Sequence, residues 1–284
     1  MKKLTIIAGL LMLCLGMSAQ TIRISTDETD LVLKIANGNR LYQAYLGKAL
    51  KNSSDIDHLK WDEFAITDGL NVVRGGEAYA TTGSEEYYET ALGMVHNDGN
   101  RSTYLYYKGH EQKAVEGGTE TIIRLADDKY PVNVTLHYVA YAKENVIKCW
   151  SEISHNEKKP VTLTQFASNL LYFKRPGYFL NEYVSDWARE VRQHTEQLKG
   201  GKKELESKQG SRAAEFMQPF FEIGFDGPAQ ENSGEVLMGN IGWNGNFRFT
   251  FEVDHFGILR VETQCLRVRY IELGAEVHLH AGRT

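Results

Sequence analysis

Several broad classes of protein are excluded by what this sequence lacks. The 284-residue chain holds three cysteines and five prolines, and its formal net charge is only −5. Lysine and arginine are scattered, so no basic stripe exists that could neutralise a phosphate backbone. After residue 15, no apolar run approaches the roughly 20 residues that a membrane-spanning helix needs. We therefore expect neither a nucleic-acid partner nor a membrane span.

Signatures of catalysis and of cofactor binding are also missing. The sequence contains no GxSxG elbow, HExxH helix, P-loop or GxGxxG turn. His278 and His280 are two residues apart and could share one strand face as metal ligands, but no third or fourth ligand is evident nearby. A solvated strand is the favoured interpretation, so we expect no metal and no cofactor.

The N-terminal segment has the three parts of a secretory signal peptide. Two lysines follow Met1, residues 4–15 form an apolar run, and residues 16–19 supply small side chains before the cleavage point. A lipoprotein anchor at Cys14 is disfavoured, because a bulky leucine precedes it. The sequence predicts that residues 1–19 are removed and that the bacterial protein is periplasmic or secreted.

Two cysteines, Cys149 and Cys265, remain after this cleavage. An oxidising compartment would let them pair, but their positions in the sequence do not show whether they lie close enough for a disulfide. We favour two separate, buried thiols.

Strand signals recur along the rest of the chain, since short segments alternate between apolar and polar residues. The segments that fit are 21–25, 31–35, 121–125, 132–142, 146–153, 161–167 and 247–253. Glycine-containing turns lie between them, at 37–39, 98–100, 116–118, 199–201 and 244–246. We predict an all-β fold: a large two-sheet antiparallel β-sandwich (supersandwich) with few short helices, formed by residues 20–284 as a single domain.

Two segments are ambiguous in this pattern. Residues 44–52 could form a short helix, and residues 186–198 place their apolar side chains at roughly helical spacing. The four tryptophans could present their faces to sugar rings, but core packing is the simpler interpretation, and we assign at least three of them to the core. They are Trp61, Trp150, Trp187 and Trp243.

Longer-range spacing carries more information than any short motif. Four ordered pieces stand at 185–190 (SDWARE), 198–201 (LKGG), 207–212 (SKQGSR) and 218–221 (QPFF). In order and spacing they resemble the N-terminal domain of glycoside hydrolase family 36, the family of α-galactosidases and raffinose-type enzymes, whose pattern reads G-x-W-x-R-E, L-x-x-G, S-x-x-G-x-S-S-H and N-P-F-F. With further matches at 83–99 and 235–247, the resemblance covers about residues 41–261, and the tail after about 261 is off-pattern.

The resemblance implies a role beside a catalytic domain rather than catalysis. In this family both catalytic carboxylates come from a C-terminal (β/α)₈ barrel, which this chain does not include. We therefore assign no catalytic residue, predict no hydrolysis by this chain alone, and count the missing barrel as a partner. The working hypothesis is the non-catalytic N-terminal part of an enzyme that hydrolyses terminal α-galactosides, with a gene fragment or changed reading frame as its origin.

The family's sandwich also lends a loop to the rim of the sugar pocket, and the positions that match this loop are Glu86 and Tyr87. A carboxylate can accept hydrogen bonds from sugar hydroxyls, and a tyrosine ring can cover an apolar sugar face; a solvated turn is the alternative. Residues 85–88 (EEYY) replace the family's G-D-F-R, and 212–215 (RAAE) replace its S-S-H. The preferred galactose-containing oligosaccharide or polysaccharide is therefore expected to differ.

The piece that contains Trp187 is predicted to lie on a strand, because the resemblance outweighs the helical spacing. We interpret it as a packing element between sandwich and barrel. A stand-alone carbohydrate-binding sandwich and an oligomerisation module, with a homo-oligomer as product, stay open as alternatives.

Overall fold

The computed structural model describes residues 20–36, 38–60, 65–68, 71–84, 86–266 and 277–279. They form antiparallel sheets with one short helix, α1 (Ser53–His58), and one 3₁₀ turn, η1 (Gly210–Arg212). The predicted signal peptide lies outside these residues. In the part of the chain that is described, no helix has the length and apolar character needed to cross a membrane.

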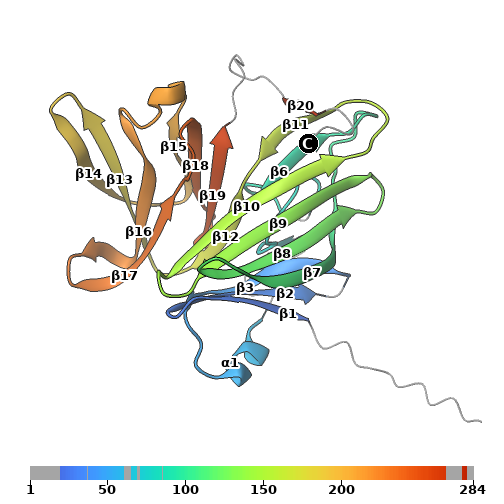
Figure 1. Ribbon diagram of the computed structural model, residues 1–284, viewed down its shortest axis with the longest axis horizontal. Coiled ribbons are helices and arrows are strands. Elements are labelled where there is room, and N and C mark those ends of the chain that lie inside the picture. Colours follow the sequence, from blue (N-terminus) through green and yellow to red (C-terminus); the bar gives the residue numbers. More distant parts are fainter. Residues whose placement is uncertain are drawn as a thin grey trace, which may run out of the picture.

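One half of the molecule packs three sheets around an aliphatic core (Figure 1). Their strands are β1 (Thr21–Ser25), β2 (Thr29–Ala36) and β3 (Arg40–Lys48); β7 (Leu105–Val115), β8 (Gly118–Asp127), β9 (Val132–Tyr141) and β10 (Val146–His155); and β6 (Leu92–Val95), β11 (Val161–Phe166) and β20 (Val277–Leu279). Alternation explains the core, since Val132, Val134 and Leu136 on β9 are buried while Asn133 between them is exposed.

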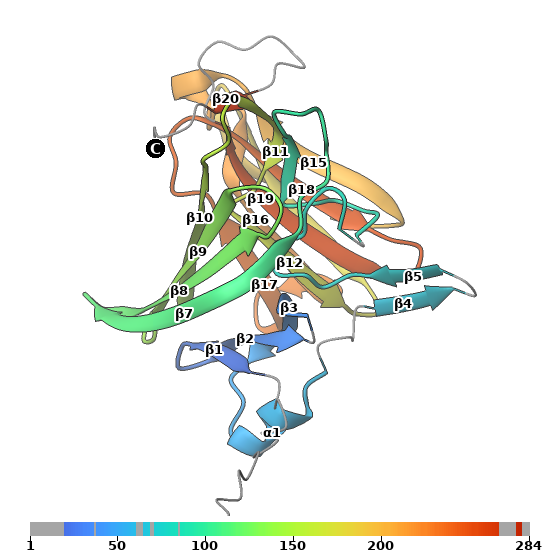
Figure 2. The same ribbon diagram turned by 90° about the vertical axis from the view of Figure 1, so that its right-hand side faces the viewer.

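The other half packs two four-stranded sheets around an aromatic core. Their strands are β12 (Asn169–Lys174), β19 (Ile258–Leu266), β18 (Asn246–Val253) and β15 (Gly201–Ser207), and β14 (Arg189–Gln197), β13 (Tyr178–Asp186), β16 (Met217–Gln230) and β17 (Ser233–Asn240). Phe221 meets Phe249 and Phe251 edge to face, at centroid distances of 4.9 and 4.8 Å. Gly239 lies against the Phe221 ring so closely that a Cβ there would collide with it. A further hairpin joins β4 (Ala65–Asp68) and β5 (Asn71–Arg74) (Figure 2).

Strand β12 connects the two halves. Leu170 and Tyr172 point into the aliphatic core, and Phe173 points into the aromatic core. The amide of Gln43 on β3 bonds to both the carbonyl and the N–H of Tyr172, at 2.7 and 3.1 Å. Strand β12 therefore contributes side chains to both cores.

The structure confirms the all-β antiparallel sandwich, and of the two ambiguous segments 44–52 is not helical. Strand β3 continues to Lys48, paired with β2, and α1 begins only at Ser53. Residues 186–198 are also not a helix, because β14 pairs along β13. Cross-strand hydrogen bonds override the local spacing in both places. The strand implied by the family resemblance is confirmed from Arg189 onward, whereas Trp187 and Ala188 form the turn before it. The single-domain assignment of 20–284 stays a prediction.

The assignment of at least three tryptophans to the core is wrong. Trp187 is 91% exposed at the tip of the β13–β14 hairpin, and Trp243 is 38% exposed in the β17–β18 loop. Trp150 is half-buried and stacks on the His137 ring at 4.5 Å. Trp61 lies outside the described residues.

The two cysteines form no disulfide, as predicted, and each is half-buried rather than buried. The side-chain amide of Asn169 contacts the Cys149 sulfur at 3.1 Å. Burial raises the pKa of the Cys149 thiol, which disfavours the reactive thiolate.

Candidate functional site

The predicted pair Glu86 and Tyr87 lies in an irregular segment before β6, and the two side chains differ sharply in exposure. Glu86 is 6% exposed, whereas Tyr87 is 71% exposed. Glu86 can therefore anchor the segment while Tyr87 faces solvent.

Arg260 on β19 is the inner anchor of this segment. Its Nη2 lies 3.0 Å from Glu86 Oε1 and its Nη1 lies 2.9 Å from Asp254 Oδ2, and all three side chains are completely buried. The guanidinium also lies over the rings of Tyr88 and Tyr172, at 4.4 and 5.5 Å from their centroids. One arginine thus binds two carboxylates from different parts of the chain.

The electrostatics of this cluster show how strongly its members depend on one another. Burial raises the pKa of the Glu86 carboxyl, and the Arg260 charge reduces that rise without cancelling it. Burial would lower the pKa of Arg260, but the charge of Glu86 and the hydrogen bonds that Arg260 donates to Asp254 and Glu86 raise it on balance. Removing either partner would leave the other charge buried without compensation.

A second anchor holds the same segment at Glu89, and its chemistry differs. Glu89 is 8% exposed and lies beside Glu262, which is completely buried. Gln165 donates to both carboxyl groups, Lys202 forms an ion pair with Glu89, and the Glu89 N–H bonds to Glu252 at 2.6 Å. Burial and the Glu89 charge raise the pKa of Glu262 to about 8, so near neutral pH it keeps its proton and shares it with Glu89.

The turn between β18 and β19 is fastened to the Arg260 cluster through Asp254. Asp254 Oδ1 accepts hydrogen bonds from the backbone N–H groups of Phe256 and Ile258, both at 2.9 Å, while Oδ2 accepts from Arg260. His255 and Phe256 at its tip are exposed. A hydrogen bond joins the Tyr88 hydroxyl to His255 Nδ1.

The two loops that Arg260 anchors carry four exposed or half-exposed ring side chains. We call this group the aromatic rim: Tyr87, Tyr88, His255 and Phe256. The rings of Tyr88 and His255 are 6.2 Å apart, and those of His255 and Phe256 are 3.8 Å apart. Apolar ring faces with polar edges are suited to a sugar ring.

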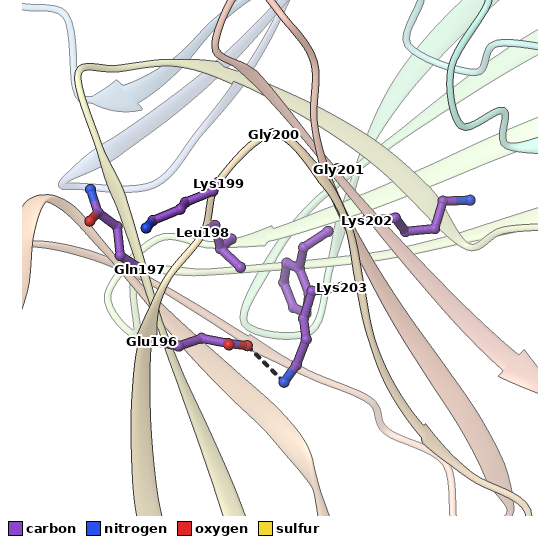
Figure 3. A pocket seen from close by; sticks show the side chains of 9 residues that line it. Glu196, Gln197, Leu198, Lys199, Gly200, Gly201, Lys202 and Lys203 are labelled. Carbon is purple, nitrogen blue, oxygen red and sulfur yellow. Dashed lines mark ion pairs between the residues drawn. The ribbon is translucent and has the colours of Figure 1, made fainter.

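Two hollows lie elsewhere, in the half of the molecule that contains the aromatic core. The first, of about 260 Å³, is lined by residues 196–203 and Phe251. Lys203 turns toward Glu196 across it, at 2.7 Å, and Lys202 turns away (Figure 3). A protein ion pair therefore already spans this hollow.

The second hollow, of about 340 Å³, lies at the β13–β14 tip. Trp187 and Phe216 line it, with 91% and 48% of their surfaces exposed. Ala188 and Val191 nearby adopt positive φ angles of 56° and 50°, which a β-branched residue such as valine rarely does. The tip is held in a strained conformation that exposes Trp187.

The histidines considered as metal ligands are not brought into any described cluster. His278 lies on β20, and His280 lies outside the described residues. Among the described residues, no group of three or more potential ligands could hold a metal ion.

Sequence reasoning missed Arg260, Asp254 and Glu262. One signal was available, because Arg260 interrupts the apolar run 258–261 (ILRV), and a charge inside a buried strand must be paired. Its partner Glu86 is 174 residues away, and no local pattern identifies it.

The fold and site define a class: a large antiparallel β-sandwich domain with two cores that presents a ring-bearing surface on two anchored loops. Residues 39–264 match the glycosyl hydrolase family 36 N-terminal domain, and the chain belongs to this family. The family resemblance is therefore confirmed.

Similar proteins include two α-galactosidases. AgaA of Geobacillus stearothermophilus is 31% identical over 156 residues, which is 55% of this chain and 20% of that protein. Mel36A of Lactobacillus acidophilus is 22% identical over 267 residues, covering 86% of this chain and 36% of the relative. This chain thus spans well under half the length of the relatives it matches.

Solved structures show the same fold. The α-galactosidase of Lactobacillus brevis superposes with a TM-score of 0.76 at 17% identity, over 94% of this chain and 38% of the other. For Geobacillus AgaA the TM-score is 0.77 at 20% identity, over 91% and 39%.

Proposed function

We propose that this domain is the non-catalytic N-terminal part of an α-galactosidase-type glycoside hydrolase, where it supports a catalytic barrel and forms part of the rim of the sugar pocket. The observation that carries the proposal is the family match over residues 39–264. The names of the relatives add the substrate class, since AgaA variants have been crystallised with stachyose and with raffinose. The proposed partners are galactose-containing saccharides and the barrel.

Within the rim we propose different roles for the two predicted residues. Tyr87 is free to cover a sugar face, because 71% of its surface is exposed. Glu86 was predicted to accept hydrogen bonds from sugar hydroxyls, but its Oε1 is bound to Arg260 and its Oε2 lies 3.5 Å from the Tyr172 hydroxyl. Glu86 therefore acts as a positioning residue that fixes the segment carrying Tyr87.

A chimera tests these roles, with residues 20–266 of this chain replacing the matching domain of Geobacillus AgaA. We expect Tyr87→Ala to raise the KM for raffinose about fivefold, the effect of losing one ring contact, without loss of stability. Glu86→Ala should raise the KM and also lower the melting temperature. Glu111→Ala is the control, since that carboxylate forms an exposed ion pair with Arg124.

The outcomes separate the roles. A higher KM for Glu86→Ala alone would assign direct sugar contact to Glu86. An unchanged KM for both variants would overturn the rim function.

We further propose that the protein is exported, on the basis of residues 1–19. Mass spectrometry of the protein from a Gram-negative periplasm should show a chain that begins at Gln20. A product in the cytoplasm that retains Met1 would overturn this proposal.

We also propose that the β13–β14 tip packs against the barrel. Trp187 and Phe216 line one hollow and are 91% and 48% exposed, and exposed apolar side chains that lie together are typical of an interface. The same surface favours oligomerisation as the alternative. In light scattering of the purified chain, a defined oligomer that Trp187→Ala dissociates would support the alternative, and a monomer would support the barrel contact.

A further inference from the structure

We propose that the β18–β19 turn is the second half of the sugar-facing surface, so that His255 and Phe256 contact an oligosaccharide that Tyr87 also contacts. The proposal rests on the rim function proposed above and adds a second loop to it. It assigns the ligand class as an α-galactoside with at least one further sugar unit.

The first argument is the shared anchor. Arg260 binds Glu86 from one loop and Asp254 from the other, at 3.0 and 2.9 Å, with all three side chains completely buried. Because one rigid guanidinium fixes both carboxylates, the two loops are held at a fixed separation. Such a preorganised pair of loops is what a binding surface needs.

The second argument is the continuity of the rings across the two loops. Tyr88 bonds to His255, and the His255 ring lies 3.8 Å from that of Phe256. Phe256 is 41% exposed, although the turn that carries it is fixed by two backbone hydrogen bonds to Asp254. An exposed ring on a fixed turn is available for contact at little entropic cost.

The third argument concerns the ligand. Tyr87 and Phe256 are 71% and 41% exposed on two separate loops, so each ring can stack on a different sugar unit. Tyrosine hydroxyls and an imidazole lie at the ring edges, where they can exchange hydrogen bonds with sugar hydroxyls. The buried charges beneath are already paired, so the surface suits a neutral ligand.

The test uses the full purified chain and NMR titration with methyl α-galactoside, raffinose and stachyose. We expect raffinose and stachyose to bind more tightly than methyl α-galactoside and to shift the His255 ring signals. Phe256→Ala should weaken raffinose binding about fivefold, as expected for one lost aromatic contact. Phe216→Ala is the matched control, because that phenylalanine is 48% exposed in the separate β13–β14 hollow.

The results distinguish this inference from the function on which it rests. If Tyr87→Ala weakens raffinose binding and Phe256→Ala does not, the second loop is not part of the site and the rim function stands. If raffinose shifts no signal of either loop in the unaltered chain, the two-loop surface inferred here falls, whereas the rim function is decided by the chimera, which contains the barrel. Circular dichroism melts confirm that each variant is folded.

Discussion

The segment that carries Tyr87 is anchored by two buried carboxylates, Glu86 and Glu89. Each needs compensation for its buried charge, and the two obtain it in different ways. At Glu86 a buried carboxylate faces a buried arginine, so the two charges compensate each other. At Glu89 a buried carboxylate faces a second carboxyl group, and a retained proton prevents repulsion. The first anchor depends on the permanent charge of Arg260, whereas the second depends in part on the proton that Glu262 retains.

Replacing Arg260 should disrupt the first anchor, and we expect it to have the largest effect on stability of the changes considered. Arg260→Met leaves Glu86 and Asp254 buried without a counter-charge, and we expect a loss of about 3–5 kcal/mol in the free energy of unfolding. Urea denaturation measures it. The control Arg124→Met removes an exposed pair whose side chains are 53% and 51% accessible, and should cost under about 1 kcal/mol. Equal losses would show that the Arg260 cluster is no anchor.

Alkaline pH should weaken the second anchor. The pKa of Glu262 is raised from 4.5 to about 8 in the fold, so the folded state binds more protons than the unfolded state between these values. Stability should therefore be greatest at the acidic end of this window and fall by about 2–4 kcal/mol as pH rises through it.

Glu262→Gln keeps the hydrogen-bonding shape without the ionisable group. The variant should remove most of this pH dependence, as measured by urea denaturation at a series of pH values, and Glu111→Gln should leave it unchanged. An equally steep profile for Glu262→Gln would rule out the shared proton.

Replacing Asp254, which joins the first anchor to the β18–β19 turn, should have a smaller effect on the free energy of unfolding. Asp254→Asn keeps an acceptor for the N–H groups of Phe256 and Ile258 but removes the charge opposite Arg260. We expect a loss of about 1–3 kcal/mol. Hydrogen exchange at Phe256 and Ile258 should stay slow, and fast exchange there would show that the turn depends on the charge itself.

The smallest effect should come from Lys202, the exposed side of the second anchor. Its side chain is 41% accessible, so solvent screens the ion pair with Glu89, and Lys202→Met should cost about 0.2–1 kcal/mol. Differential scanning calorimetry checks this. A loss as large as that of Arg260→Met would mean that charge compensation, and not the proton, holds Glu89.

The sequence predicted those parts of the fold that depend on local alternation or on ordered family motifs. Strand β1 spans residues 21–25 as expected, and β9 and β10 begin at the expected Val132 and Val146. The helical spacing of apolar residues at 186–198 did not indicate the observed structure, because pairing with β13 makes this segment a strand.

The sequence predicted which residues form part of the candidate site, but not how they are arranged. The motif at 83–99 led to Glu86 and Tyr87, but not to the fact that one side chain is buried and the other exposed. That difference is set by Arg260 on a strand distant in sequence, and no pattern within the segment contains it. The same reason explains why the β18–β19 turn was not recognised as its neighbour.

The long separation of Glu86 and Arg260 also fixes the order in which the molecule can assemble. During synthesis the Glu86 segment leaves the ribosome 174 residues before its arginine. Its carboxylate has no permanent counter-charge in the cluster until β19 joins the sheet, and pairings this distant form late in folding. The surface proposed to meet the sugar is therefore among the last parts of the domain to acquire its shape.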